Sequence, residues 1–157
     1  MSRAFVREED QLAPEPPPEF KLSSHPNLVT ARGLERIEQT IDDLNAMIAE
    51  SPIGEIKDRL LRDLRYWTAR RETARVLEPE ADSDEVRFGS RVTFRRGNGP
   101  PETLEIVGED ESDPKAGRIG WVAPLASAMM GARIGDVVML ENRQPATPIT
   151  ILAVEPI

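Results

Sequence analysis

The chain has 157 residues, of which 39% are hydrophobic and 31% are charged, a balance that favours a small packed domain joined to a well-solvated element. Its formal net charge of −8 argues against binding of duplex nucleic acid through the overall field of the protein. The absence of cysteine excludes disulfides, cysteine-based zinc sites and thiol chemistry. Neither a run of about 18 apolar residues nor the apolar core of a signal peptide is present, so we expect a cytoplasmic protein without membrane contact.

Residues 1–29 are expected to form a disordered, proline-rich tail. Prolines are frequent from Pro14 onward, and few side chains in this stretch could offset the entropy lost on ordering. Phe5 and Val6 are the exceptions, because they could dock on a sheet edge or on a partner. The only histidine, His25, also lies here, so no Ser-His-Asp arrangement is expected.

Residues 30–78 carry two helical patterns separated by a short break at residues 51–54. Apolar side chains recur at spacings of three and four from Leu34 to Ile48, and a similar pattern runs from Ile56 to Leu77. This spacing is typical of the seam of a coiled coil. Two seams of similar length joined by a short break predict an antiparallel helical hairpin.

The ends of the two helices can be predicted from capping residues and prolines. Thr30 is the predicted N-cap of the first helix, because its hydroxyl can accept a backbone N–H of the first turn. Pro52 ends the first helix near Glu50, and Pro79 stops the second, which is expected to reach about Leu77. Each arm of ~20 residues would then be roughly 30 Å long.

Acidic side chains lie near the break between the two helices, at Glu50, Glu55 and Asp58. One interpretation is a tip that presents carboxylates, which are the usual protein ligands of Mg²⁺. The other is helix-end electrostatics, because the dipole of the second helix favours acids in its first turn.

An acidic linker at residues 79–84 precedes a predicted β domain at residues 85–157. Apolar residues alternate between Val86 and Phe94, as on one face of a strand, and residues 97–101 carry a hairpin turn signal. Residues 124–131 are predicted to form a short helix. The predicted fold class is therefore α+β, with an N-terminal antiparallel α-helical coiled-coil hairpin followed by a small antiparallel β domain with one short helix.

A loop in this β domain gathers the acidic residues Glu109, Asp110, Glu111 and Asp113. Such a loop could bind Mg²⁺ through its carboxylates, but acidic runs of this kind are more often solvated. We therefore expect no catalytic residue, no bound metal and no cofactor.

Several segments, in the same order along the chain, resemble the GreA/GreB family of bacterial transcript cleavage and elongation factors. The similar segments are Val29–Leu34, Phe88–Thr93, Ile106–Glu111 and Trp121–Gly131, the last followed by Ile134-Gly135-Asp136. The resemblance implies an N-terminal coiled-coil finger and a C-terminal domain of FKBP-like fold. It also implies that the C-terminal domain docks on RNA polymerase at the secondary channel and that the finger offers acidic tip residues to the catalytic Mg²⁺.

The resemblance further implies a docking surface for the polymerase. Its matching positions are Asp110 in the acidic loop and Pro124, Leu125, Ala126, Met129 and Met130 on the short helix. Two adjacent methionines on a short helix cannot easily both face inward, so one of the two is expected to contact a partner.

The chain departs from the family at the tip of the finger. The family motif Asp-Leu-x-Glu-Asn-Ala-Glu-Tyr is absent, and the arms are shorter by about ten residues each, which would withdraw the tip by roughly 15 Å. A carboxylate must approach Mg²⁺ to about 2.1 Å, so we do not expect transcript cleavage. The chain is in this respect similar to the regulator of nucleoside diphosphate kinase, a relative with a short coiled coil.

Three functions remain open at this point. The first is a non-enzymatic, monomeric transcription factor that binds RNA polymerase at the rim of the secondary channel, modulates elongation or initiation, and contacts DNA or RNA only indirectly. The second is an active cleavage factor that uses the three tip carboxylates. The third is a peptidyl-prolyl isomerase-like binding module, whose pocket would have to be built from Phe88, Phe94 and Trp121, although fold alone does not license activity.

Overall fold

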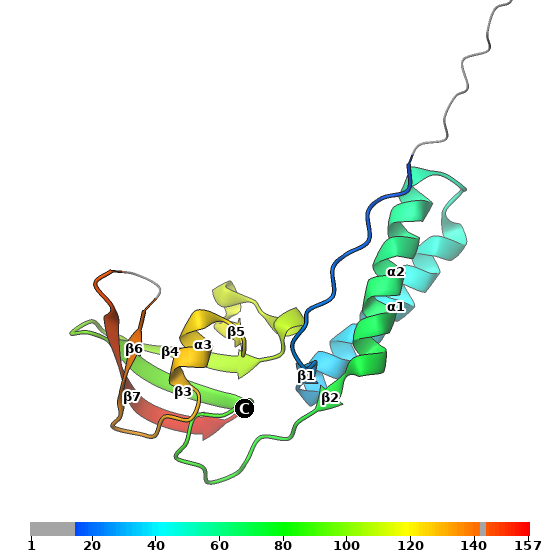
Figure 1. The fold of residues 1–157 in the computed structure, drawn as a ribbon. Coiled ribbons are helices and arrows are strands. Elements are labelled where there is room, and N and C mark those ends of the chain that lie inside the picture. The colour runs from blue at the N-terminus through cyan, green and yellow to red at the C-terminus, as the bar shows by residue number, and fades with distance from the viewer. Residues whose placement is uncertain (1–14, 142–143) are drawn as a thin grey trace, which may run out of the picture.

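The computed structural model describes residues 15–141 and 144–157, and it contains a helical hairpin beside a curled sheet (Figure 1). Phe5 and Val6 lie outside the described residues. The hairpin consists of α1 (Ala31–Glu50) and α2 (Glu55–Thr73). Thr30 is the N-cap of α1, as predicted, and its side chain accepts a hydrogen bond of 3.0 Å from the backbone N–H of Gly33.

Apolar side chains of the hairpin are buried toward its base and exposed at its tip. Ile37 and Leu44 on α1 are buried, with 2% and 5% of their surface exposed. At the tip, Ile53 is 95% exposed and Ile56 is 71% exposed. The prediction that the seam begins at Ile56 is therefore wrong, because this side chain points into solvent.

The base of the hairpin is closed by two short strands that the sequence did not predict. β1 (Leu28–Val29) pairs in parallel with β2 (Arg75–Val76). α2 accordingly ends at Thr73, before the predicted end near Leu77, and Ala74 has an extended backbone with ψ of 130°. Backbone hydrogen bonds across the two strands hold the entry and exit of the hairpin side by side.

Part of the predicted tail is therefore ordered structure. Asn27 is 4% exposed, and its amide donates a 2.6 Å hydrogen bond to the carbonyl of Arg70 near the end of α2. Residues 15–25, which form neither helix nor strand, run along α2 from the tip to the base of the hairpin (Figure 1). The expectation of disorder is wrong for residues 26–29, while residues 1–14 lie outside the described residues.

The C-terminal domain is built on a five-stranded sheet with the order β5-β4-β3-β7-β6. The strands are β3 (Ser90–Arg96), β4 (Pro101–Val107), β5 (Arg118–Gly120), β6 (Val137–Leu140) and β7 (Thr147–Pro156). The sheet is mixed and not purely antiparallel as predicted, because β4 and β5 pair in parallel. Two 3₁₀ turns, η1 (Glu109–Glu111) and η2 (Pro114–Ala116), connect these two strands in place of a hairpin.

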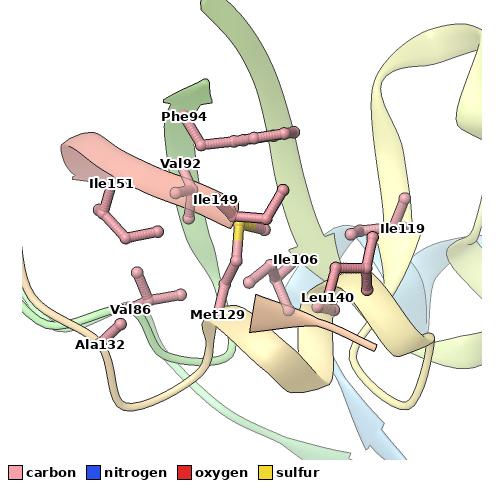
Figure 2. Packing of buried hydrophobic residues seen from close by; sticks show 11 residues of the cluster. Val86, Val92, Phe94, Ile106, Ile119, Met129, Ala132, Leu140, Ile149 and Ile151 are labelled. Atoms are coloured by element: carbon pink, nitrogen blue, oxygen red, sulfur yellow. The ribbon is translucent and has the colours of Figure 1, made fainter. Parts of the chain in front are cut away.

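The hydrophobic core lies between the sheet and the single short helix α3 (Pro124–Met129) (Figure 2). Phe94, Ile149 and Ile151 reach into it from β3 and β7, and Met129 reaches into it from α3. These four side chains are at most 1% exposed. The predicted alternation holds for Val92 and Phe94, which lie on the face of β3 that packs into the core, whereas Val86 and Phe88 precede the strand.

Over residues 15–141 and 144–157, no helix has the length and apolar character that crossing a membrane requires.

Candidate functional site

The junction between the hairpin and the C-terminal domain is formed by η1, the turn that follows β4. Gly108 leads into this turn and passes close to the backbone of β1, since a Cβ there would lie 2.6 Å from the carbonyl oxygen of Leu28. Only glycine permits this approach. The three acidic residues that follow each contact a different part of the hairpin or of the segment before it.

Asp110 binds α2 through both of its carboxylate oxygens. Its Oδ1 accepts a 2.6 Å hydrogen bond from the hydroxyl of Tyr66, and its Oδ2 accepts a 2.5 Å hydrogen bond from Nε of Arg70. The side chains are largely withdrawn from water, with 4% of Arg70 and 12% of Asp110 exposed. Burial, followed by the hydrogen bond to Asp110, raises the pKa of Tyr66 to about 12.

Glu111 binds the first turn of α1. Both of its carboxylate oxygens lie 2.8 Å from the hydroxyl of Thr30, and Nε of Arg32 lies 3.4 Å from one of them. Its side chain is 3% exposed and lies against Gly33, where a Cβ would collide with the carboxyl group. The glycine at this helical position therefore makes room for the contact between the helix and the domain.

Glu109 completes the junction. It accepts a 3.0 Å hydrogen bond from the hydroxyl of Ser23 and lies 3.8 Å from Nη2 of Arg70. The carboxylates of η1 thus face hydroxyl groups and arginines of the hairpin and of residues 15–25. This arrangement fixes the hairpin on the domain through charge-assisted hydrogen bonds.

A second ion-pair group extends this junction across the sheet. Glu105 on β4 lies 3.2 Å from Arg32 of α1 and 2.9 Å from Arg91 of β3. Burial alone would raise the pKa of Glu105, but hydrogen bonds from Arg91 and Arg32 outweigh it and lower this pKa.

The predicted polymerase-docking residues are separated by the structure. Asp110 is committed to Tyr66 and Arg70, so it is not a free surface carboxylate. On α3, Ala126 and Met129 are fully buried, which makes the prediction of a partner contact wrong for both. Pro124 is exposed and Leu125 and Met130 are partly exposed, so these three remain on the surface.

The reason for this division is the shortness of α3. In a helix of six residues, one side packs on the sheet, and positions 126 and 129, three residues apart, share that side. Met129 lies in the core and Met130 is partly buried and packs against it, so the partner contact of one methionine stays a prediction.

The predicted tip residues all lie at the end of the hairpin. Glu50, Glu55 and Asp58 are exposed, and Glu55 and Asp58 belong to the first turn of α2. Gly54 has φ of 148° at the turn, which favours glycine, and Ile53 projects beside it into solvent. Within the described part of the chain, no group of three acidic or histidine side chains is placed to hold a metal ion.

The aromatic residues considered for an isomerase pocket do not line an open cavity together. Phe88 and Phe94 are buried, with 7% and 0% of their surface exposed. Trp121 is partly exposed and lies edge-on against His25, with ring centroids 5.7 Å apart. No observation favours the isomerase hypothesis.

Sequence reasoning missed the residues of the hairpin that form the junction. Tyr66 and Arg70 lie four positions apart on α2 and therefore on one face of that helix, next to the seam. A tyrosine and an arginine at this spacing beside an apolar stripe were the available signal. The partner of that face could not be identified without the fold.

Comparison with known proteins places the chain among transcription factors. Residues 80–156 match the family model described as transcription elongation factor GreA/GreB, C-terminal. The transcription elongation factor GreB of Neisseria meningitidis (serogroup A) is 42% identical over 96 residues, which are 60% of this chain and 59% of that protein. The chain thus matches less than two thirds of the length of this relative.

A longer match and a solved structure each cover a larger share of the chain. The transcription elongation factor GreA of Limosilactobacillus fermentum is 30% identical in an alignment of 150 residues that covers 81% of this chain and 95% of that protein. Gfh1 (GreA factor homolog 1) of Thermus thermophilus covers 83% of this chain and 99% of its own, at a TM-score of 0.41 and 16% identity. On the family match and the near full-length GreA match, the chain belongs to the GreA/GreB family of transcription elongation factors.

Proposed function

We propose that this elongation factor binds RNA polymerase in the cytoplasm at the rim of the secondary channel. There it modulates elongation or initiation without promoting transcript cleavage and without being an enzyme itself. The C-terminal domain would supply the docking surface through Pro124 and Leu125 of α3 and Met130, which follows it. The hairpin would enter the channel.

The proposal that the protein does not promote cleavage is supported mainly by the residues at the tip of the hairpin. Its apex is Ile53, which is 95% exposed, and an aliphatic side chain cannot ligate Mg²⁺. The acids Glu50, Glu55 and Asp58 are exposed, and Glu55 and Asp58 lie in the first turn of α2, where the helix dipole favours acids.

The length of the arms supports the same conclusion. α1 has 20 residues and α2 has 19, so the hairpin is roughly 30 Å long at about 1.5 Å per residue. A carboxylate must come within about 2.1 Å of Mg²⁺ to act on it, and a finger shorter than that of a cleavage factor leaves its tip outside this range. The hairpin would then act as a plug or a probe.

The direct test uses purified core polymerase in two assays. Retention of polymerase by the immobilised full-length protein is expected, and loss of retention is expected for Pro124→Ala/Met130→Ala. If the wild-type protein retains no polymerase, the proposed function is wrong.

The second assay measures RNA cleavage in backtracked complexes at saturating protein. No increase over polymerase alone is expected. The alternative, an active cleavage factor, requires cleavage by the wild-type protein that disappears in the variant Glu50→Gln/Glu55→Gln/Asp58→Asn. These three side chains are exposed, so the variant is expected to fold, and it is the matched control for cleavage by the wild-type protein.

A further inference from the structure

Residues 15–25, called the strap from here on, cover one face of α2. The strap begins beside the tip, where Pro17 and Pro18 lie near Arg59 and Arg62, and it ends before the buried Asn27. It runs in the same direction as α2 and lies along its outer side (Figure 1). What this face of α2 binds depends on the proposed function.

On α2 the strap is held by one carboxylate and one aromatic ring, and nearer the base Ser23 donates a hydrogen bond to Glu109 and His25 lies against Trp121. Glu19 accepts two hydrogen bonds from the guanidinium of Arg65, one of them 2.9 Å from Nε. The ring of Phe20 lies 4.3 Å from the guanidinium carbon of Arg62 and meets the ring of Tyr66 edge-on, with centroids 5.7 Å apart. Arg62, Arg65 and Tyr66 together form the α2 face.

The strap is held more weakly than Asn27, the buried residue that follows it. Glu19 is 59% exposed and Arg65 is 55% exposed, and an ion pair of that exposure contributes little to stability. Phe20 is 50% exposed, so it is only partly covered by the protein. Asn27, by contrast, is buried and hydrogen bonded to the carbonyl of Arg70. The strap can therefore leave α2 while the base of the hairpin stays closed.

The chemistry of the α2 face indicates what it binds when the strap leaves. The guanidinium of Arg65 can bind a carboxylate, and Arg62 and Tyr66 beside it can bind an aromatic ring. This arrangement fits an extended peptide in which a carboxylate and an aromatic side chain are adjacent. Glu55 and Asp58 border the face at the tip, and Glu109 borders it at the base. These carboxylates would repel the continuous phosphates of a nucleic acid.

We propose that the α2 face is a docking face for an extended acidic segment of the polymerase, with a carboxylate next to an aromatic ring, and that the strap occupies this face as an internal competitor. The strap must leave for the segment to bind. Weakening the strap should therefore strengthen the complex, whereas reversing the charge of the face should weaken it.

Two variants of the full chain separate these effects. Glu19→Gln/Phe20→Ala removes the ion pair and the aromatic contacts of the strap with α2, retains its contacts at Ser23 and His25, and leaves the α2 face intact, so its affinity for core polymerase should rise about fivefold to tenfold. Glu19→Arg/Arg65→Glu restores an ion pair of opposite polarity but presents a carboxylate to the acidic segment, so its affinity should fall below that of wild type.

The position of the strap can be measured directly because the chain has no cysteine. Spin labels at Lys21→Cys and Thr68→Cys, both exposed positions, should give a narrow distance distribution in the free protein. The distribution should broaden when core polymerase is added, and it should be broad from the start in the Glu19→Gln/Phe20→Ala background.

The outcomes are distinguishable. If the labels stay at their narrow distance in the polymerase complex, or if Glu19→Gln/Phe20→Ala binds no tighter than wild type, the inference is wrong and the proposed function stands. If a short single-stranded RNA releases the strap and polymerase does not, the face takes phosphate and the acidic-segment assignment is overturned. If no form of the protein binds polymerase, the proposed function fails and this inference fails with it.

Discussion

The hydroxyl of Tyr66 donates a 2.6 Å hydrogen bond to Asp110 and thereby joins α2 to the turn after β4. The two residues are 44 positions apart in the chain, so this bond crosses the whole junction between hairpin and domain. Arg70 shares the same carboxylate. A position that family resemblance assigns to polymerase contact therefore holds the protein's own hairpin.

Tyr66 should titrate well above an ordinary tyrosine. Its pKa is raised from 10.0 to about 12, first by burial and then by the hydrogen bond to Asp110. Because the folded state holds the proton more tightly, this contribution to stability is complete below about pH 10 and is lost as the pH rises toward 12. Tyr66 is the only tyrosine, so absorbance at 295 nm reports its ionisation without interference.

The variant Asp110→Ala tests the cause of this shift. Its tyrosine should titrate below 12 but above 10, because burial, the larger cause, remains. Circular dichroism at each pH shows whether the chain is still folded. A midpoint near 10 in the folded wild-type protein would contradict the arrangement.

Arg70→Met should destabilise the protein strongly. The substitution leaves the buried carboxylate of Asp110 without its cation, and losing one partner of a buried ion pair costs about 3 kcal/mol or more in the free energy of unfolding. Urea denaturation measures this loss. The matched control is Arg71→Met, whose arginine is 55% exposed in its pair with Glu38 and should cost less than about 1 kcal/mol. Equal losses in the two variants would show that the junction is not anchored by Arg70.

Gly33→Ala should destabilise α1 although alanine is the better helix former. Intrinsic propensity favours alanine by about 1 kcal/mol, but the new methyl group would collide with the carboxyl group of Glu111. That carboxyl group is held by Thr30 and Arg32 and cannot move away without losing hydrogen bonds. The expected net loss in unfolding free energy is about 1–3 kcal/mol.

Whether Gly33→Ala lowers or raises the free energy of unfolding depends on the side chain at position 111. In a Glu111→Ala protein the obstacle is gone, so Gly33→Ala should stabilise by about 1 kcal/mol relative to its own parent. Stabilisation of the wild-type protein by Gly33→Ala would contradict the close contact between the helix and the turn.

The two adjacent methionines of the α3 region should respond differently to truncation. Met129→Ala removes a fully buried side chain and should cost about 2–5 kcal/mol in unfolding free energy. Met130 is only partly buried, so Met130→Ala should cost less but should weaken retention of core polymerase. A larger stability loss at Met130 than at Met129 would reverse the assignment of core and surface.

The helical hairpin, the N-cap at Thr30 and the alternating strands of the C-terminal domain could be predicted because each depends on neighbours within a few residues. Local patterns failed where the fold brings distant segments together. The helical spacing continues through Ala74 and Leu77, but pairing with β1 draws the chain into an extended conformation after Thr73. A two-residue strand has no periodicity to detect.

The junction could not be predicted for a related reason. Thr30 and Glu111 are 81 positions apart, and nothing in either local sequence indicates the other. The acidic turn suggested a solvated loop, a metal site or a docking surface, because in isolation its carboxylates have no partners. Disorder of the strap was predicted from its composition. Composition alone cannot show that two arginines and a tyrosine of α2 contact Glu19 and Phe20.

The small sheet formed by β1 and β2 ties together the two points where the hairpin begins and ends. The hydrogen bonds of η1 with the hairpin described above lie toward this end, and the tip projects away from the C-terminal domain (Figure 1). Inserting seven residues into each arm would advance the apex by about 10.5 Å without changing the attachment. Insertions or deletions in the two helices can therefore change how far the tip lies from the C-terminal domain while the attachment of the hairpin to that domain stays the same.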